Sequence, residues 1–237
     1  MALLALYTII LGSFGILLCL VVPGGRLLIP LARLWSWLVL RTAGVRHTVI
    51  RHPAFDPRRP AVYIANHQSL LDVPALTLAM PGDFRMVAKR ALLHVPIFGW
   101  ALWLAGFVFI DRSDRDSAIR SFDRVGHRLA RGTSVVVFAE GSRSNDGRLL
   151  PFKKGGFVLA LQTGAPIVPV SLAGGIDLLP RGRARVRKGT IRVVFGQPVE
   201  TSRYSLLDKG RLMDEVRARV EEGLQVTQAP VKPQGSG

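Results

Sequence analysis

The sequence predicts an α/β fold: a mixed, largely parallel sheet of about seven strands flanked by helices, with an N-terminal membrane-associated helical hairpin. Two observations lead to this prediction. From about residue 47, short runs rich in β-branched and aromatic residues alternate with longer helical patterns, which is the order of a layered α/β domain. Before these runs, residues 1–25 contain no charged side chain.

Length and composition narrow the class of protein. The 237 residues suffice for one domain with an appendage. A net charge of +16 together with 49% hydrophobic residues suits either nucleic acid or an anionic membrane surface as a partner. The apolar N-terminus and the lack of interleaved basic and aromatic residues argue against nucleic acid. The single cysteine, Cys19, excludes an internal disulfide, and the histidines show no metal-ligand spacing, so we predict no metal site.

The N-terminal segment predicts membrane attachment. Residues 3–22 are apolar and long enough to cross or enter a bilayer, which takes roughly 20 residues. Five arginines follow without any acidic residue before Asp56, which places the rest of the chain on the cytoplasmic face of the inner membrane. A cleaved signal peptide is less favoured, because no basic region precedes the apolar run. We therefore expect residues 1–45 to form membrane-anchoring helices.

A second segment, residues 27–40, is too short and too polar to span a bilayer. Its mixture of tryptophan and arginine suits an interfacial helix, or the return arm of a hairpin that dips into one leaflet. A buried core helix is the alternative, since periodicity alone does not separate the two.

The remainder divides into a domain over residues 46–225 and a tail over residues 226–237, which is rich in Gln, Pro and Gly and is expected to be disordered. Within the domain we expect strands at residues 47–51, 60–65, 84–89, 107–111, 133–139, 167–172 and 190–196. We expect helices at residues 73–80, 97–105, 115–131, 153–163 and 205–224. In such sheets, ligands bind at the carboxyl ends of the strands.

One such strand end carries a potential acid–base pair. His67 follows an apolar run, and Asp72 comes five residues later. Histidine titrates near neutral pH and acts as a general base when an acceptor holds its second ring nitrogen. Ser69 and Asp72 have the spacing of a helix capping box, although Pro74 leaves the start of the following helix open.

Two other strand ends carry arginines. Residues 107–112 (FVFIDR) end in Asp111 and Arg112, and residues 138–144 (FAEGSRS) contain Glu140, Gly141 and Arg143. Arginine suits a phosphate because its planar donors bind two oxygens at once. Lys153 opens a predicted helix whose amino terminus also favours an anion. Together these residues predict a site with one base and several phosphate-binding groups.

These stretches resemble the four motifs of the glycerolphosphate acyltransferase superfamily, and are most similar to those of bacterial 1-acyl-sn-glycerol-3-phosphate acyltransferases. Residues 66–72 match N-H-x-x-x-x-D, residues 106–112 match G-x-x-F-I-D-R, and residues 138–144 are similar to F-P-E-G-T-R-S. Residues 167–170 (IVPV) resemble the fourth motif. Two positions of the third motif depart from the pattern: Ala139 replaces Pro and Ser142 replaces Thr.

The resemblance implies direct acyl transfer from acyl-CoA or acyl-acyl-carrier-protein to the free hydroxyl of 1-acyl-sn-glycerol 3-phosphate, giving phosphatidate, with no bound cofactor. Another lysolipid acceptor is the alternative. His67 would be the base and Asp72 would orient its ring. The substrate-binding residues implied are Arg112, Glu140, Gly141, Ser142, Arg143 and Lys153. A developing oxyanion needs donors, either near the histidine turn or at residues 169–170.

Two further features have open interpretations. Arginines alternate over residues 181–187 and Lys188 follows them, so this stretch could attract anionic lipid headgroups or the acidic acyl donor, or could be a solvated face. Trp100 and Trp103 could line an acyl pocket, but core positions are the prediction we adopt.

Overall fold

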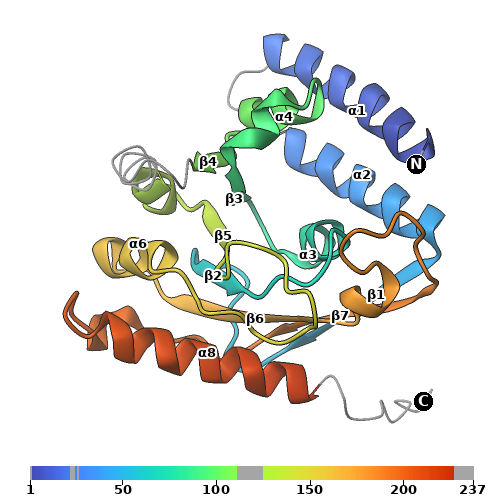
Figure 1. Ribbon diagram of the computed structural model, residues 1–237. Helices are drawn as coiled ribbons and strands as arrows, with labels where there is room; N and C mark the ends of the chain where they lie inside the picture. Colours follow the sequence, from blue (N-terminus) through green and yellow to red (C-terminus); the bar gives the residue numbers. More distant parts are fainter. Residues whose placement is uncertain (1, 22–24, 26, 111–124, 227–237) are drawn as a thin grey trace, which may run out of the picture.

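The computed structural model describes residues 2–21, 25, 27–110 and 125–226. Its described residues form one seven-stranded sheet in the order β1-β7-β6-β2-β5-β3-β4 (Figure 1). The strands are β1 (Val45–Arg51), β2 (Val62–Ala65), β3 (Phe84–Lys89), β4 (Val108–Ile110), β5 (Ser134–Phe138), β6 (Ile167–Ala173) and β7 (Gly189–Phe195). The seven predicted strands are confirmed.

The helices are α1 (Ala2–Val21), α2 (Leu28–Ala43), α3 (Asp72–Ala79), α4 (Phe98–Leu104), α6 (Gly155–Thr163), α7 (Gly175–Leu178) and α8 (Lys209–Val226). Two short 3-10 helices are η1 (Arg90–His94) and η2 (Thr201–Arg203). Residues 125–129 are also helical, whereas most of the helix predicted at residues 115–131 lies outside the described residues. The predicted tail beyond residue 226 lies outside them too.

The sheet is mixed and is covered on both faces. β2 pairs in parallel with β5 and β6, and β3 pairs in parallel with β4 and β5, whereas β7 runs antiparallel to β6. All four residues of β2 are buried, and they alternate between two apolar clusters, as strand geometry requires. Helices α2 and α3 cover one face, and α6 and α8 cover the other (Figure 1). The carboxyl ends of β2, β5 and β6 therefore meet at one edge.

One face of helix α2 packs against the domain. For that face, the structure favours the alternative prediction of a buried core helix over an interfacial helix. Leu28, Ile29 and Leu40 are buried, and α2 contacts α3. Arg33, whose position we had read as suited to headgroup depth, donates instead to the carbonyl oxygens of Met80 at 3.0 Å and Gly82 at 2.9 Å. These carbonyls follow the end of α3, so Arg33 joins α2 to the domain.

Helix α1 has small and polar residues on its inner face. The Trp35 indole N–H of α2 donates to Thr8 Oγ1 at 3.0 Å, and Gly12 lies against Ile97, at the start of α4. Its outer face exposes large apolar side chains: Leu3, Leu6, Ile9, Ile10, Phe14, Leu17 and Val21. Within the parts of the chain that the structure describes, no helix combines the length and apolarity needed to cross a bilayer.

The prediction that Trp100 and Trp103 belong to the core is wrong. Their exposed fractions are 53% and 62%. Helix α4 has only seven residues, and its packed side is occupied by Gly99 and by Phe98, whose ring lies 5.7 Å from that of Trp35. A short helix that is apolar all round can bury only the side that meets its neighbours, and the tryptophans lie outside that side.

Candidate active site

Three loops converge at the carboxyl edge of the sheet. His67 follows β2, residues 140–144 follow β5, and Gly174 with Gly175 follows β6. The register pairs Ala65 with both Phe138 and Val170, so β2 and β5 end at the same level, while β6 continues to Ala173. The backbone N–H of Ser144 donates to the carbonyl oxygen of His67 at 2.9 Å, which joins the first two loops directly. The strand ends that carry His67 and Glu140 therefore lie together as predicted, whereas Arg112, beyond the end of β4, lies outside the described residues.

His67 and Asp72 form the predicted pair. His67 Nδ1 lies 2.9 Å from Asp72 Oδ2. The carboxylate is fully buried, while the histidine side chain is 16% exposed. Because a carboxylate only accepts hydrogen bonds, we assign the proton to Nδ1, which leaves the Nε2 lone pair for a substrate. The imidazole stacks on the Phe138 ring at 4.2 Å, so packing as well as hydrogen bonding fixes its orientation.

Asp72 also fixes the turn that carries the histidine. Its Oδ2 accepts the backbone N–H groups of Gln68 at 2.6 Å and Ser69 at 2.7 Å. The Ser69 bond is one half of the predicted capping box; in place of the other half, Ser69 Oγ donates to the carbonyl of Leu179 at 3.0 Å. Helix α3 begins at Asp72, so Pro74 falls in the first turn, where a missing N–H costs nothing.

Glu140 holds the same turn from the other side. Its Oε1 accepts the backbone N–H of His67 at 3.3 Å, and its side chain is only 3% exposed. The amides of residues 67–69 are thus all bound to carboxylates, and Val170 is buried within the sheet. The amides of residues 67, 68 and 69 are therefore not available as oxyanion donors.

Burial raises the pKa of Glu140 to about 7, against the opposing effect of the hydrogen bond from His67 N–H. The folded state therefore binds a proton more tightly than the unfolded state does. The stability gained from this tighter proton binding is fully present below pH 4.5, the ordinary pKa of the carboxyl group, and is lost as the pH rises towards 7. The loss over that window is on the order of 3 kcal/mol.

We expect the Glu140→Gln variant to lack this dependence. The free energy of unfolding, measured by urea titration from pH 4.5 to pH 7.5, should fall for the wild type relative to the variant as the pH rises. Glu222→Gln, at an exposed position on α8, should follow the wild type. Parallel curves for the wild type and Glu140→Gln would show that Glu140 does not bind the proton.

The loop after β5 carries the remaining predicted residues. Gly141 has a φ of 73°, which only glycine adopts readily, and its N–H donates to the carbonyl of Phe138. Ser142 is exposed and Arg143 is partly exposed. Lys153 is exposed at the other end of the loop, where its N–H donates to the carbonyl of Ala139 at 2.7 Å. The two ends of the loop therefore meet beside the histidine turn.

Helix α8 fixes the far side of this loop. Arg217 donates to the carbonyl oxygens of Leu149 at 3.0 Å and Leu150 at 2.7 Å, and it lies over the ring of Phe152. Arg112, which follows β4, lies outside the described residues. In the described residues, no three His, Cys, Asp or Glu side chains gather closely enough to hold a metal ion.

Three residues at the site had no predicted role. Asn66 Oδ1 accepts the N–H of Leu172 at 2.7 Å and Nδ2 donates to its carbonyl at 3.0 Å, so the amide continues the pairing of β2 with β6. Phe138 supports the imidazole. Gly175 lies so close to Asp72 that a Cβ there would meet Oδ1 at 2.5 Å. The Gly174–Gly175 pair at a strand end was the available sequence signal.

Comparisons with known proteins identify a family and relatives of similar sequence. The model of the Acyltransferase family matches residues 46–173. Over 168 residues the chain is 36% identical to the chloroplastic 1-acyl-sn-glycerol-3-phosphate acyltransferase BAT2 of Brassica napus, covering 70% of this chain and 47% of that protein. Over 175 residues it is 38% identical to the Homo sapiens 1-acyl-sn-glycerol-3-phosphate acyltransferase alpha, covering 73% and 62%.

The chain spans about half the length of the first curated relatives that it matches, 46–49% of each. Among solved structures, it is similar to the 1-acyl-sn-glycerophosphate acyltransferase PlsC from Thermotoga maritima. The TM-score is 0.77, with 98% of this chain and 97% of that chain covered. At 24% sequence identity, this likeness shows a shared fold.

Proposed function

The chain belongs to the Acyltransferase family, and on that premise we propose that it transfers a fatty acyl group from an acyl thioester to the free hydroxyl of 1-acyl-sn-glycerol 3-phosphate, giving phosphatidate for phospholipid synthesis. The observation that carries the proposal is the contact of His67 Nδ1 with the buried Asp72 carboxylate. This contact lies at the carboxyl edge of the sheet, where the surrounding loops are rich in cations. This contact leaves one ring nitrogen available for a substrate hydroxyl.

His67 is the general base of the proposed reaction. An alcohol attacks a thioester slowly until a base takes its proton during the attack. His67 Nε2 takes this proton as the substrate oxygen bonds to the acyl carbon, and the thiolate leaves with its electron pair. The buried Asp72 carboxylate stabilises the imidazolium that forms and keeps its ring in place. Because the substrate supplies the hydroxyl, the protein needs no nucleophile of its own.

Cations at the same edge bind the acceptor phosphate in this proposal. Arg143 and Lys153 stand at the two ends of the loop after β5, and Arg112 follows β4. Guanidinium groups bind phosphate oxygens in pairs, which suits this role. Gly141 and Ser142 form the exposed turn between the histidine and these cations and contact the glycerol part of the acceptor. Glu140 contributes by holding the His67 amide.

The acyl donor is anionic whether it is acyl-CoA or acyl-acyl-carrier-protein. The loop between α7 and β7 brings five exposed cations to the same edge, because β7 runs antiparallel to β6. They are Arg181, Arg183, Arg185, Arg187 and Lys188. Arg181 donates to Asn145 Oδ1 at 3.2 Å, which ties this loop to the loop after β5. The resulting field attracts either donor towards the histidine.

Residues 1–45 anchor the protein to the cytoplasmic face of the inner membrane in this proposal, and residues 46–225 form the acyltransferase domain. The distribution of side chains on α1 supports the anchor. Its packed side includes Thr8, Gly12 and Gly15, whereas its outer face exposes large apolar groups that a helix on a protein in water would bury. Such a face is stable against lipid, and it would hold the domain where the insoluble acceptor lies.

A panel of acceptors tests the function and the phosphate-binding role of Arg143 together. Purified protein is incubated with labelled acyl-CoA or acyl-acyl-carrier-protein and with lysophosphatidate, other lysophospholipids or monoacylglycerol. We expect lysophosphatidate to be the preferred acceptor. The Arg143→Ala variant should raise the KM for lysophosphatidate roughly 10- to 100-fold, the value of a charge-assisted hydrogen bond, and leave the KM for monoacylglycerol unchanged.

Arg148→Ala is the matched control, because it removes the same charge from the same loop at an 89% exposed side chain. Its KM values should stay close to those of the wild type. Preference for another lysolipid would assign a different acceptor within the same family. Equal KM changes in the two variants would remove Arg143 from the phosphate site.

A further inference from the structure

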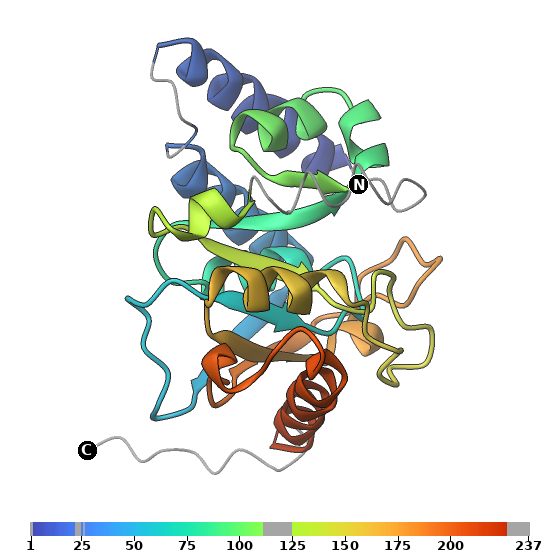
Figure 2. The ribbon, with the colours of Figure 1, turned by 90° about the vertical axis from the view of Figure 1, so that its left-hand side faces the viewer.

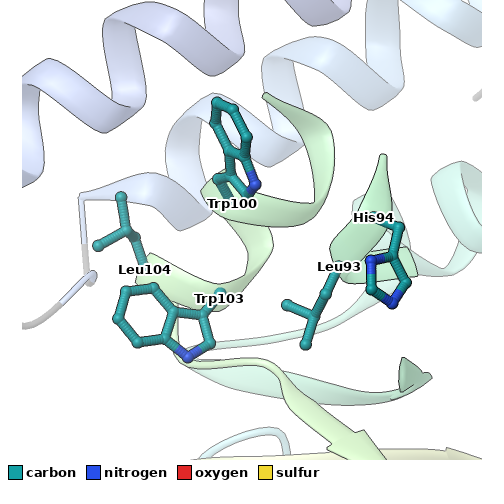
Figure 3. Close-up of a pocket in the computed structure, with 5 residues that line it drawn as sticks. All are labelled: Leu93, His94, Trp100, Trp103 and Leu104. Atoms are coloured by element: carbon teal, nitrogen blue, oxygen red, sulfur yellow. The ribbon is translucent and has the colours of Figure 1, made fainter. Parts of the chain in front are cut away.

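An open apolar hollow lies between η1 and α4. Figure 3 shows Trp100, Trp103 and Leu104 projecting from α4, and Leu93 and His94 from η1, around a cavity of about 500 Å³. These five residues are called the tryptophan face below. Both indole rings are more than half exposed, an unusual position for the largest apolar side chain in a protein surrounded by water.

The tryptophan face is carried in part by α4, which packs against α1. Helices α1 and α4 pack against each other and run side by side in both views (Figures 1 and 2). Their junction is close: a Cβ on Gly12 would lie 2.5 Å from Ile97 Cγ2. Ile97 has a φ of 63°, a strained conformation for a β-branched residue, and directly precedes α4. This junction fixes the position of α4 relative to α1.

In the part of the chain that the structure describes, the segments that form this surface carry basic charges only. The chain contains 16 acidic residues, yet residues 1–55 and 84–110 contain none. Lys89 and Arg90 are exposed immediately before the tryptophan face, and His94 lies within it. A mixture of tryptophan and cations without acids complements the headgroup region of an anionic bilayer, where an indole ring contacts acyl chains and its N–H remains hydrated.

We propose that the tryptophan face is a second membrane-contacting surface, which rests in the headgroup region of an anionic bilayer beside the outer face of α1. The choice of a lipid surface as the partner rests on the proposed function, because an enzyme with a membrane lipid as acceptor works at such a surface. Because the outer face of α1 and the tryptophan face lie on different elements, two such contacts fix the orientation of the domain as well as its distance from the bilayer. One contact alone leaves the domain free to rotate.

Tryptophan fluorescence tests this proposal in the full-length chain. The protein has four tryptophans, so the Trp35→Phe/Trp37→Phe variant emits only from the tryptophan face. We expect vesicles of phosphatidylglycerol and phosphatidylcholine to shift its emission to the blue. Vesicles with brominated acyl chains should quench it. Emission that stays unchanged while the protein sediments with the vesicles would overturn the proposal, because α1 would then bind alone.

A pair of variants measures the contribution of the face to binding. Trp100→Ala/Trp103→Ala should weaken partition into the same vesicles roughly tenfold or more, given the apolar area that two indoles bury. Leu206→Ala/Leu207→Ala is the matched control, since it removes exposed apolar side chains from the loop before α8. Equal loss in both pairs, or no loss in the tryptophan pair, would contradict a specific contact. The fluorescence measurement decides the question even if the alanine pair does not fold.

Failure of this inference is distinguishable from failure of the proposed function. Acyl transfer to a short-chain, water-soluble lysophosphatidate without vesicles should be the same in the Trp100→Ala/Trp103→Ala variant and the wild type. If vesicles quench the Trp35→Phe/Trp37→Phe variant but the wild type shows no acyl transfer, the function fails and the surface stands. If the wild type shows transfer while the variant is not quenched, the surface fails and the function stands.

Discussion

Replacing His67 with alanine is expected to lower kcat for acyl transfer by about 10²- to 10⁴-fold, the usual contribution of a positioned general base. The imidazole of His67 lies beside the buried Asp72 carboxylate, and none of the contacts described for it involves Nε2. This nitrogen is therefore available to take the proton of the substrate hydroxyl. The KM for the acceptor should change little, because binding depends on the cations of the edge. Initial rates with lysophosphatidate and a labelled acyl thioester measure the effect.

The fold of the variant must be checked in the same preparation. Loss of a side chain that is 16% exposed and stacked on Phe138 should leave the far-ultraviolet circular dichroism spectrum unchanged. His52→Ala is a suitable control, because His52 is exposed in the loop after β1, where its Nδ1 accepts the N–H of Ala54. Turnover by a folded His67→Ala protein at a tenth of the wild-type rate or more would remove His67 from the role of base.

Asp72→Asn is expected to lower both activity and stability. One oxygen of Asp72 accepts three hydrogen bonds, from His67 Nδ1, Gln68 N–H and Ser69 N–H. An asparagine has no charge to stabilise an imidazolium or to strengthen the hydrogen bonds from the turn amides. If its carbonyl oxygen takes the place of Oδ2, its NH₂ group is buried at the position of Oδ1, where the described residues offer no hydrogen-bond partner. We expect a loss of about 10²- to 10⁴-fold in kcat and a loss of about 1–3 kcal/mol in the free energy of unfolding.

Rates and urea titrations of the same protein measure these two effects. Asp214→Asn on α8 makes the same chemical change at an exposed position and should alter neither. A variant that is destabilised but retains full kcat would show that Asp72 serves the turn alone. A variant that is inactive but fully stable would show that its three hydrogen bonds contribute little to folding.

Much of the fold followed from local patterns in the sequence. The strands were predictable because runs rich in β-branched residues, such as residues 134–138, favour extended structure and lower the propensity for helix. The site followed from the same reasoning, because parallel strands bring their carboxyl ends to one edge, and His67 and Glu140 each follow such a strand. The five-residue spacing already suggested that His67 pairs with Asp72, and His67 Nδ1 lies 2.9 Å from Asp72 Oδ2.

Other features depend on contacts between distant parts of the chain, which no local pattern encodes. Trp100 is as apolar as a core residue, and only the packing of α4 decides that it is exposed. In the sequence Arg33 resembles an interfacial arginine. Only the packing of α2 against α3 brings it to the carbonyl oxygens that follow α3. The hydrogen bond from His67 N–H to Glu140 joins residues 73 positions apart, so the binding of the turn amides by carboxylates was not predictable.

The most direct test of direct acyl transfer is a single-turnover reaction with a labelled acyl thioester, followed by intact-mass measurement of the protein and analysis of the lipid. Without an acceptor, we expect the protein to keep its unmodified mass. When lysophosphatidate is added, labelled phosphatidate should form at the rate at which the thioester is consumed. An acylated protein that forms first and then passes its label to the acceptor would contradict the role of His67 as a base acting on the substrate hydroxyl.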